Sequence, residues 1–316
     1  MSVFFVKRFM TLLATLFGAS VVIFLVMEIL PGDPALVILG VDATPEATAA
    51  LTKELGLDRP ALERYFTWIS GLLVGELGNS YAYKVPVTEL ISGALKITFP
   101  LAIMSMALSV ILALVIGLYA AAHHNKASDV TLMGISQLGI SIPNFWLAVL
   151  LVLFFAVNLR WFPPGGFPGW EEGFWPAVRS LVLPAVALAT VQGAMLARIT
   201  RSSVLEVYRE DFVRTARAKG VSRQATLWGH VLRNAMIPVL TVMGIQFGNL
   251  LVGTVIAENV FHLPGLGSTV LKAINNRDII VVENVVLLLA AIVVIVNFFV
   301  DILYAVVDPR LKAHDI

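Results

Sequence analysis

The chain has 316 residues, of which 58% are hydrophobic and 14% are charged, and its formal net charge is +1. A soluble domain is nearer half apolar and a quarter charged, so this composition predicts an integral membrane protein and argues against a soluble domain. The absence of cysteine excludes disulfides, Cys-ligated zinc and thiol catalysis.

Six apolar segments are long enough to cross a bilayer as helices, because roughly 20 residues span its core of about 30 Å. They are residues 9–30, 99–122, 130–159, 181–200, 237–257 and 281–307. Backbone polar groups in lipid must bond within their own segment, so these segments are expected to be helices. The first is too long for a signal-peptide core and no Ala-x-Ala site follows it, so we expect a retained anchor. The sequence thus predicts an all-α integral membrane protein with six transmembrane helices.

Basic residues indicate the orientation, because cytoplasmic loops carry an excess of Lys and Arg. Lys7 and Arg8 precede the first span, and two further bases follow the last one. The stretch 198–233 contains eight basic and three acidic residues, whereas the stretch 31–97 contains five basic and eight acidic residues. We therefore expect both termini and the Arg-rich loop in the cytoplasm and the stretch 31–97 outside.

The external stretch carries helix signals and is expected to be ordered. Thr44-Pro45-Glu46 predicts a helix start with proline just inside the cap, and Gly56 predicts its end. A second helix is expected to begin at Pro60 and to end near Gly75. The expected organisation is an N-terminus with the first span (1–30), a small helical external segment (31–97) and a five-span core (98–316) whose cytoplasmic loop is 201–235.

The cytoplasmic loop contains a short basic helix, predicted from Arg209 to Lys219. Lys219 suits the negative end of the helix dipole, Gly220 can take the left-handed conformation that ends a helix, and Ser222 can cap a second helix. Ordinary cytoplasmic charge explains the composition but not this order of helix, glycine and cap. Such an element is suited to a groove on a soluble partner. The chain contains no Gly-Lys pair and hence no phosphate-binding loop, so ATP hydrolysis by this chain is not expected.

Uncharged polar residues in the spans are candidates for a translocation pathway, because such groups in lipid either line a water path or bond between helices. The candidates are Gln137, Ser141, Asn144, Gln192, Gln246 and Asn249. The first three are spaced to share one face of the third span, beside Pro143, which can break the helix. Glycines of the fifth span favour close packing instead, so both interpretations stay open; they are Gly244, Gly248 and Gly253.

Asp301 is the one acidic residue well inside a span, which makes it a functional candidate by default. It lies one to two turns from the cytoplasmic end, near Arg310 and Lys312, so a structural ion pair is favoured over proton coupling. The pair His123-His124 indicates a membrane edge, and we predict no catalytic, cofactor-binding or metal-binding residue. The glycine-rich run 258–267 is expected to be a turn-forming connector between two spans.

Six short motifs, taken together, resemble one known family. They are Pro31-Gly32-Asp33-Pro34, Leu55-Gly56-Leu57-Asp58, Thr215-Ala216-Arg217-Ala218-Lys219-Gly220, Arg233-Asn234-Ala235-Met236-Ile237-Pro238, Pro264-Gly265-Leu266-Gly267 and Asp308-Pro309-Arg310. From about Lys7 to Lys312 the chain is similar to permease subunits of bacterial ABC importers. The closest resemblance is to the dipeptide, oligopeptide, nickel and glutathione family, in the subunit type with a long first external segment.

The resemblance implies an ATPase-coupling role for seven residues of the cytoplasmic loop. They are Arg214, Thr215, Ala216, Arg217, Ala218, Lys219 and Gly220. Thr215, Ala216 and Gly220 occupy the places of the importer-wide Glu-Ala-Ala…Gly signature, and Arg214 replaces its leading acid. Arg217 and Lys219 are the candidates for the main polar contact with the ATPase.

The resemblance further implies a multi-pass, non-enzymatic subunit of the bacterial cytoplasmic (inner) membrane that moves short peptides by alternating access. The implied partners are a second homologous permease, two ABC ATPase subunits that bind ATP and Mg²⁺, an external solute-binding protein and membrane lipid, with no nucleic acid. Nickel or glutathione are alternative substrates. An ion-driven secondary transporter is the alternative from another class, although it predicts essential mid-membrane charges and inverted repeats. A membrane-embedded enzyme lacks a supporting nucleophile–base or metal constellation.

Overall fold

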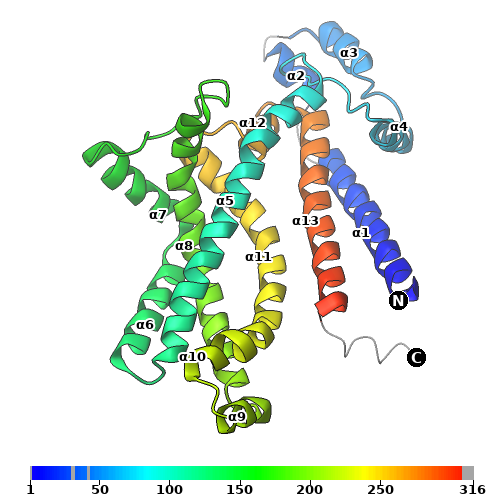
Figure 1. The fold of residues 1–316 in the computed structure, drawn as a ribbon. Coiled ribbons are helices and arrows are strands. Elements are labelled where there is room, and N and C mark those ends of the chain that lie inside the picture. Colours follow the sequence, from blue (N-terminus) through cyan, green and yellow to red (C-terminus); the bar gives the residue numbers. More distant parts are fainter. Residues whose placement is uncertain (1, 30–32, 41–42, 308–316) are drawn as a thin grey trace. The chain divides into compact units, whose positions relative to one another are not determined.

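The computed structural model describes residues 2–29, 33–40 and 43–307, and the regular elements in these residues are helices apart from one isolated bridge between Asn79 and Pro86 (Figure 1). The α-helices are α1 (Ser2–Ile29), α2 (Pro34–Leu39), α3 (Pro45–Glu54), α4 (Ala61–Val74), α5 (Val87–Ala122), α6 (Ala127–Ser141), α7 (Asn144–Leu151), α8 (Phe174–Val207), α9 (Asp211–Ala218), α10 (Arg223–Thr226), α11 (Leu232–Val260), α12 (Leu266–Asn275) and α13 (Ile279–Val307). Two π-helical segments, Val152–Asn158 and Leu227–Val231, continue α7 and join α10 to α11. The all-α prediction is confirmed.

The chain divides into two compact units. The first unit comprises Phe99–Leu263, together with the described parts of Met1–Val6 and Ile295–Ile316. The second unit comprises the described parts of Lys7–Thr98 and Pro264–Val294. The long helices α5 and α13 contribute residues to both units.

Five helices of the described chain are long and apolar enough to cross a membrane, and the pair α6 and α7 adds a sixth crossing if it counts as one span. The prediction of one continuous helix over 130–159 is wrong, because α6 ends at Ser141 and the chain bends by 101° into α7. The reason is Pro143, which has no N–H to donate and disfavours helical backbone at the residue before it. Ile142 accordingly has extended backbone angles (φ −80°, ψ 124°).

Several helices exceed the predicted apolar runs, because backbone hydrogen bonding continues past the lipid-length core of each run. Thus α5 begins at Val87 rather than near residue 99, and α8 extends over Phe174–Val207 rather than 181–200. The prediction of a connector over 258–267 is wrong at both ends, since α11 continues to Val260 and α12 begins at Leu266. The hydroxyls of Ser268 and Thr269 bond the Gly265 carbonyl and support this first turn.

The two helices predicted within 31–97 are confirmed as α3 and α4. The Thr44 hydroxyl accepts a hydrogen bond from the Ala47 N–H at 3.3 Å and caps α3. Gly75 ends α4 with a left-handed φ of 82°, and Gly56 follows α3 with φ 68°. A further short helix, α2, begins where the Asp33 carboxylate accepts from the Ala35 N–H at 2.8 Å.

The core of the second unit is built from one apolar face each of α1, α5, α12 and α13. Its buried members are Met27, Val87, Ile91, Ala94, Leu266, Val270, Ala273, Val281, Val282 and Val285. Asp278, in the turn between α12 and α13, pins the loop that precedes α5. Its Oδ2 atom accepts from the Ser80 hydroxyl at 2.5 Å and from the Ala82 N–H at 3.0 Å.

In the first unit α8 packs against α6, α7 and α11, and glycines let α5 approach α8 closely. A Cβ atom added at Gly117 of α5 would lie 2.8 Å from both the Ala197 carbonyl oxygen and the Thr200 Cβ. A Cβ atom at Gly193 of α8 would lie 3.0 Å from the Leu112 Cβ. Small residues at helix contacts in membranes permit such packing, so these two glycines set the α5–α8 spacing.

Gly244 makes a comparable contact between α11 and α13, which supports the close-packing interpretation of the fifth span. We predict that Gly244→Val lowers the free energy of unfolding by about 1–3 kcal/mol, because an added Cβ would lie 2.5 Å from a methyl group of Val300. Chemical unfolding of the purified chain in mixed micelles measures this change. Gly18→Val is the control, since a Cβ atom there meets nothing within 4 Å. Equal stability of the two variants would contradict the predicted contact.

Candidate functional site

The predicted basic helix is present as α9, Asp211–Ala218, and its C-terminal end is fixed by backbone geometry. Gly220 has a left-handed φ of 85° and donates its N–H to the Arg217 carbonyl at 3.0 Å. The Val221 N–H donates to the Ala216 carbonyl at 3.2 Å. This pair of bonds is the Schellman motif, which strongly favours glycine at the left-handed position. The predicted helix end at Gly220 is therefore confirmed.

The next helix begins at the predicted cap. The Ser222 hydroxyl accepts from the Ala225 N–H at 3.2 Å and starts α10. Helical backbone then runs through the π-helical segment into α11, as Figure 1 shows beside α9. Pro238 lies inside α11 without ending it.

One apolar side chain anchors α9 to the rest of the first unit. Val213 is 3% exposed and packs in a buried cluster with four residues. They are Ala121 of α5, Val204 of α8, Val231 of the π-helical segment before α11, and Ala235 of α11. Val213 was not among the seven predicted coupling residues. Six of those seven are exposed and Ala216 is half-buried; the exposed ones are Arg214, Thr215, Arg217, Ala218, Lys219 and Gly220. The helix thus has one buried attachment point and a broad basic surface.

A cavity of about 510 Å³ lies between α9 and the helices that hold it. Arg214, Arg217 and Arg223 line it, together with Tyr208 and His124. Arg223 is held in place because its guanidinium donates to the Ala122 carbonyl at 3.1 Å. No acidic side chain of the described chain lines this cavity, so its charge suits an acidic or carbonyl-bearing group of a partner.

A buried ion pair near this surface was not identified from the sequence. Arg201 of α8 contacts Asp129 of α6 through two bonds, Nε to Oδ1 at 2.6 Å and Nη2 to Oδ2 at 2.7 Å. The Asp129 side chain is 3% exposed and also accepts from the Asn125 N–H at 3.0 Å. His124 lies 3.4 Å from the same carboxylate. The sequence signal that could have indicated this pair is the position of the two residues. Asp129 lies at the start of the predicted third span, and Arg201 lies at the end of the predicted fourth span.

The six candidate pathway residues belong to the first unit, and they differ in burial and in hydrogen-bond partners. Because of the bend at Pro143, Asn144 starts α7, and the expectation that it shares a helix face with Gln137 and Ser141 is wrong. The Gln137 side-chain amide oxygen accepts from the Arg198 guanidinium at 2.9 Å. The Ser141 hydroxyl donates to the Gln137 backbone carbonyl. Asn144 and Gln192 are half-buried and Asn249 is exposed.

Gln246 differs from the other five because its side chain is 1% exposed. Neither its amide nitrogen nor its amide oxygen has a hydrogen-bond partner among the described residues. A buried amide without partners costs about 1–3 kcal/mol, so this side chain disfavours the conformation seen here.

We predict that Gln246→Leu raises the free energy of unfolding of this conformation by about 1–3 kcal/mol, because the variant removes the unpaired amide at similar volume. Unfolding in mixed micelles measures the change. Gln192→Leu, on a half-buried residue, is the control and is expected to change stability less. A large loss of stability in Gln246→Leu would show instead that the amide is satisfied.

Asp301 lies in α13, but its side chain is outside the described residues, as are Arg310 and Lys312 of the expected ion pair. The proposed structural role of Asp301 therefore stays a prediction. Among the described residues no group of three His, Cys, Asp or Glu side chains is placed to hold a metal ion.

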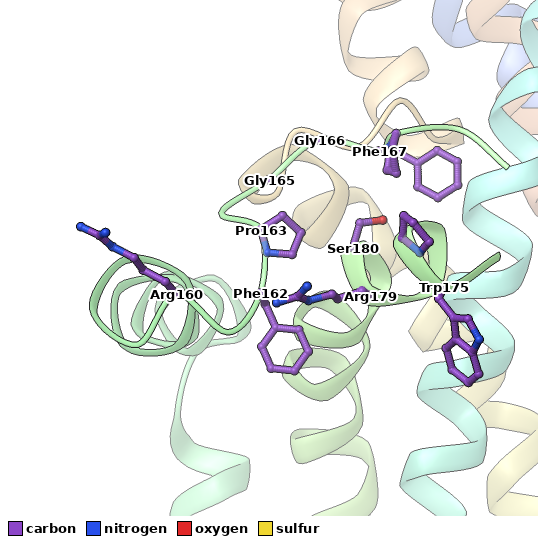
Figure 2. A pocket seen from close by; sticks show the side chains of 11 residues that line it. Arg160, Phe162, Pro163, Gly165, Gly166, Phe167, Trp175, Arg179 and Ser180 are labelled. Atoms are coloured by element: carbon purple, nitrogen blue, oxygen red, sulfur yellow. The ribbon is translucent and has the colours of Figure 1, made fainter. Parts of the chain in front are cut away.

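A larger cavity, of about 740 Å³, lies where the loop after α7 meets the start of α8 (Figure 2). Figure 2 shows Arg179 directed toward Phe162 and Pro163, whereas the Arg160 side chain extends away from the other labelled side chains. The Arg179 guanidinium donates to the Trp161 carbonyl through both Nε, at 2.9 Å, and Nη2. The Arg179 guanidinium thus holds the loop after α7 against the start of α8.

Comparison with known families gives two matches that together cover most of the chain. Residues 113–313 match the family described as binding-protein-dependent transport system inner membrane component. Residues 1–102 match the family described as its N-terminal membrane component.

Two relatives illustrate the similarity to full-length proteins. The chain is 37% identical over 326 residues to a dipeptide transport system permease protein of Alkalihalophilus pseudofirmus, with 97% of this chain and 98% of the relative covered. It is 39% identical over 307 residues to a glutathione transport system permease protein of Escherichia coli O6:H1, with 97% and 98% covered.

The helical arrangement also resembles a solved structure. A methionine ABC transporter in inward-facing conformations matches with a TM-score of 0.58 at 18% identity, covering 69% of this chain and 96% of that chain. At this identity the match indicates a shared fold.

Proposed function

The chain belongs to the family of binding-protein-dependent transport system inner membrane components, and we propose that it forms part of the membrane channel of a peptide importer driven by separate ATPase subunits. It is a permease subunit of ABC importers and contains no nucleotide-binding motif of its own. A second, homologous permease completes the channel, and an external solute-binding protein delivers the substrate. The termini and α9 lie in the cytoplasm, and 31–97 lies outside the inner membrane.

The geometry of α9 is the observation that carries the proposed coupling role. A short helix with one buried anchor, Val213, and a basic outward face is suited to a groove on a soluble subunit. The rigid glycine-terminated end at Gly220 keeps this face at a fixed angle. The arginine-lined cavity beneath α9 can accept an acidic or carbonyl group of the ATPase.

The same contacts supply a route for motion into the membrane. When the ATPase subunits close on ATP, a displaced α9 carries Val213 and therefore the helices packed around it. The ion pair between Asp129 and Arg201 links the start of α6 to the C-terminal part of α8. A ligand or partner shifts a conformational equilibrium only through different contacts in the two states, and these are the contacts that would differ.

Co-purification tests the coupling surface. In the double variant Arg214→Glu with Arg217→Glu, reversed charge on the outward face is expected to reduce the co-purified ATPase by about tenfold or more. The control is Lys53→Glu with Lys272→Glu, two exposed bases outside α9, which should retain the ATPase. ATPase recovery that is the same in both double variants would exclude α9 as the docking element.

Short peptides are the proposed substrates because a relative of nearly full coverage is named a dipeptide transport permease. The glutathione transport relative supports glutathione, itself a small peptide, as the second candidate. Uptake of a labelled dipeptide into proteoliposomes containing the full transporter and internal ATP tests the choice. Excess unlabelled dipeptide should suppress uptake more than excess glutathione does. The reverse order would favour glutathione, and uptake without ATP would contradict the ATP-driven mechanism.

A further inference from the structure

A cavity of about 330 Å³ in the second unit is separate from the coupling surface and from the pathway candidates. Its walls come from α1, the end of α3 and the segment after it, α4, the loop before α5 and the first turns of α13. The volume is at the lower end of the range for small-molecule sites, about 300–1,000 Å³. Aromatic side chains form one wall and carboxylates another, and the residues that matter are Phe24, Trp68, Tyr81, Glu54, Glu76 and Glu283.

Glu283 is the central observation. Its side chain lines the cavity although the residue is only 6% exposed. Among the described residues no hydrogen bond and no ion pair within 4 Å reaches its carboxylate. Arg64 also lines the cavity and lies over the Phe24 ring, but its guanidinium already forms an ion pair with Glu28. A carboxylate removed from bulk water is costly unless it is paired or takes up a proton, so a cation in the cavity would stabilise its charged form.

The other charged residues that line the cavity are two acids and two arginines, and both arginines already pair with other glutamates. Glu54 and Glu76 line it as exposed acids, whereas Arg59 interacts with Glu63 at 3.5 Å. Burial, and then the charges of Glu283 and Asp278, raise the pKa of Tyr81 to about 12. Tyr81 therefore stays a neutral phenol at physiological pH, and the charges around it belong to glutamates and arginines.

The aromatic wall is held in a fixed position. The Trp68 indole donates to the Asn284 side-chain oxygen at 3.3 Å and stacks on Phe24 with 6.4 Å between ring centres. Asn284 in turn donates to the Leu77 and Ile280 carbonyls. Preorganised aromatic faces attract organic cations, whereas a metal ion needs several oxygen ligands. No three acidic or histidine side chains of the described residues are grouped for a metal.

We propose that this cavity binds the ammonium group of a small organic cation, with Glu283 as its counter-ion and Trp68 and Tyr81 as its aromatic walls. The identification of the ligand as the amino end of a short peptide rests on the proposed function; the cation site itself does not. An ammonium group there pairs with the buried Glu283 carboxylate.

Calorimetric titration of the full chain in nanodiscs of zwitterionic lipid tests this site. The probes are the dipeptide Ala-Phe with a free amino group and N-acetyl-Ala-Phe, which lacks the ammonium charge. Ala-Phe is expected to bind, and the acetylated probe is expected to bind at least about tenfold more weakly, because a charged hydrogen bond is lost. Equal binding of the two probes, or no binding of Ala-Phe, would overturn the proposal without any variant.

Substitution then locates the site. Glu283→Gln keeps the size of the side chain and is expected to weaken Ala-Phe binding by about tenfold or more. Glu89→Gln, an exposed acid of α5 that does not line the cavity, should leave binding unchanged. Equal binding by wild type and Glu283→Gln would place the ammonium site elsewhere.

The uptake assay separates this proposal from the proposed function. Binding that depends on Glu283, in a transporter that moves no peptide, would overturn peptide import and the peptide ligand but support the ammonium site. ATP-driven peptide uptake with no Ala-Phe binding to this chain would overturn the site and leave the function intact.

Discussion

Replacement of Gly220 by valine is expected to reduce ATP-driven uptake by about tenfold or more while the chain still inserts into the membrane. Gly220 has φ 85° and supplies the left-handed residue of the Schellman motif that ends α9. A left-handed backbone costs a residue with a side chain about 1–2 kcal/mol, and a β-branched one more. We expect the variant to avoid that cost by losing the hydrogen bonds from the N–H groups of residues 220 and 221 to the carbonyls of Arg217 and Ala216. The loss would change the angle at which α9 is presented to its partner. Uptake and coupled ATP hydrolysis in proteoliposomes measure the effect.

A series at the same position sharpens this test. Asparagine adopts the left-handed conformation more readily than alanine or valine, so activity should fall in the order Gly, Asn, Ala, Val. No atom lies within 4 Å of a Cβ placed at Gly220, so the order reports backbone conformation and not crowding. Gly134→Val, at an exposed helical glycine with an equally open surrounding, is the matched control. Wild-type uptake by Gly220→Val would remove the proposed coupling role.

Removal of the Asp129 carboxylate is the second large effect that we expect. Asp129→Ala leaves the Arg201 guanidinium without its two-bond partner, and breaking a buried ion pair costs about 3–5 kcal/mol. We therefore expect little folded protein after gentle heating, as measured by fluorescence-detected gel filtration. Insertion itself should continue, because the apolar runs are unchanged.

Two comparisons distinguish this from a general loss of charge. Asp211→Ala removes the partner of Arg214 in an exposed pair, with side-chain exposures of 95% and 74%, and should change stability by less than about 1 kcal/mol. The double variant Asp129→Ala with Arg201→Met removes both charges and should recover part of the lost stability. Equal stability of Asp129→Ala and Asp211→Ala would show that the buried pair contributes nothing.

The sequence predicts five of the spans and the end of α9 because both depend on local rules. An apolar run of this length in lipid must satisfy its backbone hydrogen bonds internally, which favours a helix. The end of α9 is predictable because glycine adopts the left-handed conformation without steric cost. The third span was predicted wrongly because a proline does not always end a helix. Pro100, Pro184 and Pro238 lie inside continuous helices, whereas Pro143 lies in a 101° bend. Residue type alone therefore does not identify the proline that ends a helix.

The candidate site shows the same limit. The seven proposed coupling residues could be listed from the sequence, but the contact made by Val213 could not, because its partners come from helices distant in the chain. Asp129 and Arg201 are 72 residues apart, so only the packed bundle reveals the pair. Gln246 was one of six equivalent candidates until its burial without a partner distinguished it.

The glycine contacts between α5 and α8 have a mechanical consequence. With Gly117 against the Ala197 carbonyl and Gly193 against Leu112, each helix backbone sits in an indentation of the other. Sliding one along the other would drive side chains into backbone, and packed interiors resist such compression. Within the first unit the two helices should therefore tilt as a single stiff body. A displacement of one end of the α5–α8 pair would then be transmitted to its other end. Gating would change the tilt of the two helices and not their position along each other.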